Sequence, residues 1–86
     1  MMTTARIVVY TTPYCPSCKS YIKMLLPACA QANISVEVKN AMENLPDTPI
    51  THVPATFIYD DEGKFVHYTG AQDVQKIIDE YKAMNR

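Results

Sequence analysis

The chain has 86 residues, of which 48% are hydrophobic and 20% charged, and its 8 basic and 9 acidic residues give a net charge of −1. This near-neutral balance gives no electrostatic reason to bind nucleic acid or an anionic membrane, and no apolar run approaches the length of a membrane span. The length predicts one domain covering residues 1–86. Because Met1 to Ala5 lack the pattern of a secretory signal, we expect a cytoplasmic protein.

The first half of the chain predicts a strand, a helix and a second strand. Arg6 to Thr11 is a β-branched and aromatic run typical of a buried strand. Apolar residues then recur at helical spacing from Pro16 to Ala32, and Pro27 should kink or interrupt that helix. Between Ile34 and Lys39, apolar and polar residues alternate, which indicates a half-buried strand. A right-handed crossover would make the two strands parallel.

The second half predicts a hairpin and a closing helix. Residues 40–53 are irregular, with one possible helical turn from Ala41 to Leu45. Ala55 to Tyr59 and Lys64 to Tyr68 are expected strands, joined by a turn in which Gly63 supplies a positive φ. Gln72 to Met84 has one apolar helical face. The order βαβ, loop, ββα predicts an α/β fold with a four-stranded mixed sheet flanked by helices.

Two of the three cysteines form a close pair, Cys15-Pro16-Ser17-Cys18, between the first strand and the first helix. At that place the sulfur of Cys15 can face unpaired backbone N–H groups and the positive end of the helix dipole, which favour a thiolate. Cys18 lies one helical turn further on, within reach of a mixed disulfide formed on Cys15. The pair therefore predicts thiol–disulfide exchange, with Cys15 as nucleophile and Cys18 as resolving thiol.

Two other interpretations of the cysteines are weaker. A chance pair of buried cysteines does not account for the proline between them at a strand-to-helix junction. Tetrahedral zinc needs further ligands at tight spacing, and His52 and His67 are isolated from each other. Cys29 falls on the core-facing side of the helix and is expected to be a small buried hydrophobe. We therefore predict no metal site.

The segment before the third strand contains Val53-Pro54. A cis proline here would expose the backbone of Val53 to an extended substrate, which could pair with it like an added strand. An ordinary trans proline at the start of a strand is an equally good explanation of this feature taken alone.

Taken together, the Cys-Pro-Ser-Cys pair, Val53-Pro54 and Gly70 before the last helix resemble the thioredoxin and glutaredoxin families. The resemblance covers nearly the whole chain and implies a thioredoxin-like fold, with Cys15 attacking, Cys18 resolving and a cis Pro54 facing the pair. Short length and Cys-Pro-x-Cys are similar to glutaredoxins.

In glutaredoxins an aspartate near the last helix holds glutathione, and Asp73 would be its counterpart, with Val53 supplying backbone hydrogen bonds. A first-turn acid favoured by the helix dipole is an equally good account of Asp73. Tyr14 is expected to line the substrate groove; a packing role is the alternative interpretation. Two features of glutaredoxins are missing from this chain. No basic residue closely precedes Cys15, and Ala71 stands in place of the second glycine of the glutaredoxin segment. Thioredoxin features are missing too, since the chain has no tryptophan and Val9 stands where thioredoxins bury an acid.

The resemblance implies a monomeric dithiol oxidoreductase, either a small glutaredoxin or a glutaredoxin-like thioredoxin, with no tightly bound cofactor. Its substrates would be disulfide-containing proteins, with ribonucleotide reductase as one candidate. Its electrons would come from glutathione, as a reducing co-substrate, or from thioredoxin reductase. The alternatives are a glutathione-dependent iron–sulfur glutaredoxin, a redox-inert binding module and a secreted oxidant. The intact cysteine pair argues against the first two of these.

Overall fold

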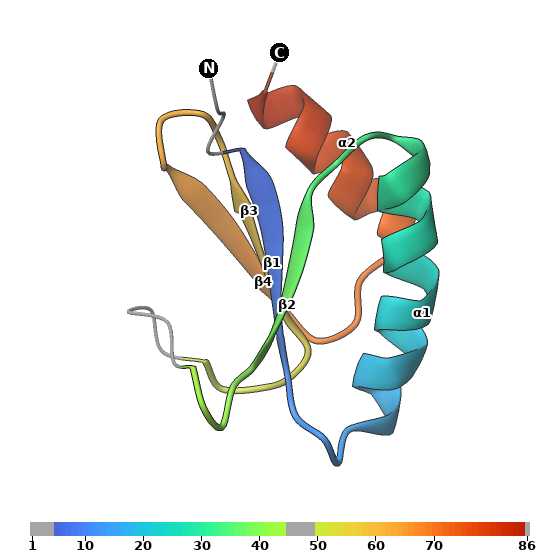
Figure 1. The fold of residues 1–86 in the computed structure, drawn as a ribbon. Coiled ribbons are helices and arrows are strands. Elements are labelled where there is room, and N and C mark those ends of the chain that lie inside the picture. Colours follow the sequence, from blue (N-terminus) through green and yellow to red (C-terminus); the bar gives the residue numbers. More distant parts are fainter. Residues whose placement is uncertain (1–4, 45–49, 86) are drawn as a thin grey trace.

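A computed structural model describes residues 5–44 and 50–85. Its elements follow the order β1 (Arg6–Thr11), α1 (Pro16–Gln31), β2 (Val36–Asn40), β3 (Ala55–Tyr59), β4 (Phe65–Thr69) and α2 (Val74–Met84). The βαβ and ββα halves predicted from the sequence are confirmed, and both helices lie beside one sheet (Figure 1). Within these residues no helix combines the length and the apolar character that crossing a membrane requires.

The four strands form one mixed sheet in the order β2-β1-β3-β4. β1 is central, pairing in parallel with β2 and antiparallel with β3, and β3 pairs antiparallel with β4. Asp60 shapes the β3–β4 turn by accepting backbone N–H groups of Glu62 and Lys64, both at 2.9 Å. Gly63 adopts the expected positive φ of 86° there.

Helix α1 begins at the cysteine pair. Cys15 is its N-cap and Pro16 is its first helical residue. Proline has no backbone N–H, and at this position an N–H would have no partner within the helix. Pro27 is exposed and does not interrupt the helix, contrary to one of the two predicted effects. The helix ends where Asn33 takes a φ of 58°, which turns the chain so that the Ile34 N–H meets the Cys29 carbonyl at 2.8 Å.

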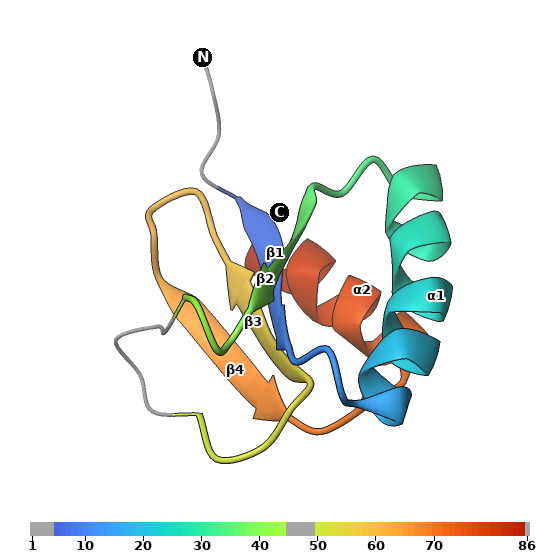
Figure 2. The ribbon, with the colours of Figure 1, turned by 60° about the horizontal axis from the view of Figure 1, so that its bottom comes forward.

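Both helices cover the same face of the sheet (Figure 2). The main core lies between them and that face, and it contains alternate strand residues such as Ile7, Val9 and Ile58 packed against Leu25 and Ile77. Predicted flanking by helices is confirmed, but the sheet is flanked on one side.

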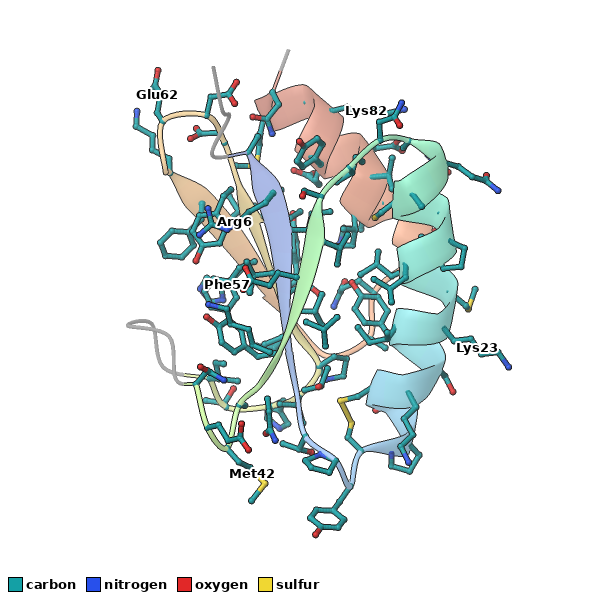
Figure 3. The ribbon with its side chains drawn as sticks, in the orientation of Figure 1. Arg6, Lys23, Met42, Phe57, Glu62 and Lys82 are labelled. Carbon is teal, nitrogen blue, oxygen red and sulfur yellow. A yellow bond between two sulfur atoms is a disulfide. The ribbon has the colours of Figure 1, made fainter. Side chains whose placement is uncertain are left out.

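The opposite face carries a second, smaller cluster of Val8, Tyr10, Ala55 and Phe57. Among the described residues no helix lies over it, and Phe57 points away from the helices in Figure 3. The ring of Phe57 contacts those of Tyr10 and Phe65, with centroids 5.4 and 5.5 Å away. Aromatic contacts within the sheet therefore shield this face where no helix does.

Two further differences from prediction concern β2 and the turn that follows it. Strand β2 is an edge strand, so Val38 is 43% exposed although the alternation predicted its burial. The turn after β2 is held by Asn40, whose carbonyl accepts the Asn44 N–H at 2.8 Å. The predicted helical turn is seen as a turn over residues 41–43, and Leu45 lies outside the described residues.

Candidate active site

The site forms where several strand ends meet at one edge of the sheet. Because β1 and β3 are antiparallel, the end of β1, which leads to Cys15, lies beside the start of β3, which follows Pro54. The end of β4 joins them, since Ala55 pairs with Thr69 and the Gly70 N–H donates to the Pro54 carbonyl at 2.8 Å. Residues separated by up to 55 positions are thereby gathered around the N-terminus of α1.

Cys15 and Cys18 form a disulfide, with their Cα atoms 5.2 Å apart, at the N-terminal end of α1 (Figure 3). The Cys18 N–H donates to Cys15 Sγ at 3.1 Å, and the Ser17 hydroxyl lies 3.3 Å from the same sulfur. The predicted placement of Cys15 before the helix is confirmed. A sulfur there receives an N–H that the helix leaves unpaired, and this stabilises a negative charge when the disulfide is reduced.

The two cysteines differ in accessibility. Cys15 is 9% exposed and Cys18 is 2% exposed. Cys15 is thus the more accessible of the two residues, which favours it over Cys18 as the first point of contact.

The Val53–Pro54 peptide bond is cis, as the resemblance implied. Cys15 Sγ lies 3.9 Å from the carbonyl oxygen of Val53. Val53 is half-buried and Pro54 buried. The structure therefore brings the cysteine pair and the Val53-Pro54 segment into contact.

The other predicted site residues lie further out. Tyr14 is 86% exposed beside Cys15, where its ring is available to a bound molecule. Asp73 is the N-cap of α2, and its Oδ1 accepts the Gln75 N–H at 3.1 Å.

His52 is exposed, with Nδ1 3.2 Å from the Thr51 hydroxyl. Cys29 is fully buried as predicted, and burial raises the pKa of its thiol above the ordinary 9.0.

A groove of about 460 Å³ adjoins the disulfide on the side of β2. Cys18, Lys19 and Ile22 of α1 form one wall, and Val38 and Asn40 of β2 form the other. Lys23 is also among the lining residues, although its side chain extends away from the sheet in Figure 3. Within residues 5–44 and 50–85, no cluster of three or more histidine, cysteine or acidic side chains is suited to a metal ion.

One pair near the site was missed from the sequence. The hydroxyls of Tyr21 and Thr56 hydrogen-bond at 2.8 Å in the interior. Burial is the main cause that raises the pKa of Tyr21 above 10.0. Helical spacing places Tyr21 on the apolar face of α1, and the signal for a hydrogen bond was Thr56, the one threonine in the run Ala55–Tyr59.

No protein-family model matches the chain, and a comparison with curated proteins finds no match either. Solved structures do match it over most of its length. The thioredoxin of Fasciola hepatica superposes with a TM-score of 0.78 at 15% identity, covering 94% of this chain and 81% of that one.

Two further thioredoxins give similar results. For thioredoxin f2 of Chlamydomonas reinhardtii the TM-score is 0.74 at 20% identity, with 96% and 81% of the two chains covered. For the thioredoxin of Trichomonas vaginalis it is 0.71 at 22% identity, with 92% and 78% covered. At these identities the similarity concerns the fold, and it confirms at that level the resemblance stated from the sequence: the chain has the thioredoxin fold.

Proposed function

We propose that the protein is a dithiol–disulfide oxidoreductase that reduces disulfides of other molecules through Cys15 and Cys18. The observation that carries this proposal is the position of Cys15 Sγ. It forms a disulfide with Cys18, accepts the Cys18 N–H at 3.1 Å and lies 3.9 Å from the Val53 carbonyl. One sulfur thus has a resolving partner, a charge-stabilising donor and an adjacent backbone segment for substrate.

The first step is attack by the Cys15 thiolate on one sulfur of a substrate disulfide. The substrate S–S bond breaks, one substrate thiolate leaves and takes up a proton, and a mixed disulfide remains on Cys15. Cys18 then loses its proton and attacks the Cys15 sulfur, releasing the second substrate thiol. Two electrons have passed to the substrate, and the protein is left with the Cys15–Cys18 disulfide seen in the structure.

The substrate class we propose is a disulfide in an extended polypeptide. Val53 precedes β3 at the sheet edge where Cys15 lies, and its backbone can pair with such a segment. The exposed ring of Tyr14, which precedes Cys15 in the chain, would pack against the same segment.

The reductant that restores both thiols is the finer question. Glutathione would use the Val53 backbone and the Asp73 carboxylate, which would make the protein a glutaredoxin. Thioredoxin reductase would not need the Asp73 carboxylate, and Asp73 would then be a helix cap alone.

Two coupled assays on one peptide disulfide test the function and the reductant together. One supplies NADPH with thioredoxin reductase, and the other supplies NADPH, glutathione and glutathione reductase. We expect turnover in one of them, abolished by Cys15→Ser and retained by Cys29→Ala, the matched change at the buried thiol. Turnover in neither assay, or dithiol turnover by Cys15→Ser, would refute the mechanism.

A further inference from the structure

The hydrogen bond between the Tyr21 and Thr56 hydroxyls is a polar contact in an otherwise apolar part of the core. Tyr21 is 3% exposed and Thr56 fully buried, and the oxygens are 2.8 Å apart. Burying hydroxyls is unfavourable unless they pair, and an apolar pair of similar size would fill the same space. Packing alone therefore does not explain why two hydroxyls stand here.

The two residues lie in the interior, on the two elements that carry the halves of the candidate active site. Tyr21 lies one turn beyond Cys18 on α1, the helix that begins at the cysteine pair. Thr56 lies two residues beyond Pro54 on β3, the strand that the Val53-Pro54 segment leads into. Their bond joins the element that carries Cys15 to the element that carries Val53.

We propose that Tyr21 and Thr56 are positioning residues that hold Cys15 at the distance from Val53 that a polypeptide disulfide requires. This inference rests on the proposed function. Apolar contacts between a helix and a sheet are non-directional and tolerate small displacements, whereas a hydrogen bond has a narrow range of length and angle. The pair thus fixes α1 relative to β3 close to the point where Cys15 Sγ and the Val53 oxygen lie 3.9 Å apart.

The consequence is a difference between substrate classes. A polypeptide must pair with the Val53 backbone and present its sulfur to Cys15 at the same time, so its rate depends on the spacing of those two groups. A small disulfide such as bis(2-hydroxyethyl) disulfide needs only the Cys15 sulfur. Loss of the hydroxyl pair should slow the first reaction and leave the second unchanged.

The double variant Tyr21→Phe/Thr56→Val tests this. Both replacements keep the shape of the side chain, and removing both hydroxyls together leaves no unpaired partner, so stability should change little. The fully reduced protein, freed of reductant, is mixed with either disulfide, and formation of the Cys15–Cys18 disulfide is followed over a single turnover. We expect the rate constant for a peptide disulfide to fall about tenfold, less than the roughly 100-fold that a 1 Å misplacement can cost.

Thr56→Ser is the control because it keeps the hydroxyl, and it should keep most of the peptide rate. Equal peptide rates for the double variant and the wild type would overturn the inference, and so would equal losses with both disulfides. Failure of the wild-type chain to react with either disulfide would instead refute the proposed function, and the inference with it.

Discussion

Asp73 is the N-cap of α2, and variants at this position test its contribution to stability and to glutathione binding. It caps the helix by accepting the Gln75 N–H at 3.1 Å. Asp73→Ala removes this acceptor and should lower the free energy of unfolding by about 1 kcal/mol. In a domain of this size that loss lowers the thermal midpoint by roughly 4–8 °C. Asp73→Asn keeps an oxygen acceptor of equal capping quality and should cost much less.

Thermal and urea unfolding of the oxidised proteins measure these differences under matched conditions. If Asp73→Ala were as stable as the wild type, the capping argument would be refuted. Equal destabilisation by the alanine and asparagine replacements would refute it as well. The same two variants address glutathione in the coupled assay. If the carboxylate holds the amino group of glutathione, both variants lose glutathione-dependent turnover although the alanine variant alone is destabilised. Full turnover of Asp73→Asn would leave Asp73 with the capping role only.

Three further predictions follow from burial and from the proposed mechanism. Cys18→Ser should accumulate a mixed disulfide on Cys15 that mass spectrometry detects after acid quenching; a variant that releases peptide as fast as the wild type would contradict the resolving role. Burial raises the pKa of Cys29 in the folded chain, so the unfolded chain loses that proton first and the free energy of unfolding should fall as the pH rises above about 9. Cys29→Ala should reduce that slope in urea titrations, and an unchanged slope would exclude Cys29 as its source. Leu25→Ala, at a fully buried position, should cost about 2–5 kcal/mol, whereas Leu26→Ala, at a position 40% exposed, should cost far less in the same unfolding experiment.

Local patterns were enough to predict the type and order of the elements. β1 and β3 begin and end at the predicted residues. Thr12-Pro13 ends the first β-branched run, and Pro54 and Asp60 bound the second. The last helix starts two residues later than the apolar spacing predicted. Periodicity shows the helical face, but the start depends on which side chain caps the helix, and here that side chain is Asp73.

The arrangement of the elements in space could be predicted less completely from the sequence. The order βαβ-ββα does not state on which face the last helix packs, so the placement of both helices on one face emerged from the structure. Val38 was expected to be buried because it alternates correctly, yet it lies on the edge strand β2, where the groove separates it from the start of α1. Alternation predicts which side a residue faces, whereas burial also requires a neighbour on that side.

The candidate site shows the same division between local and distant information. The reactivity of Cys15 could be argued from four consecutive residues, because a helix N-terminus is a local feature. Its contact with Val53 spans 38 positions and depends on the antiparallel pairing of β1 with β3. The Tyr21–Thr56 bond depends further on which face of α1 lies over β3, and no spacing within either segment encodes that. The chemistry of the pair is therefore local, whereas its selectivity for polypeptide disulfides would reside in contacts that form only when the sheet has assembled.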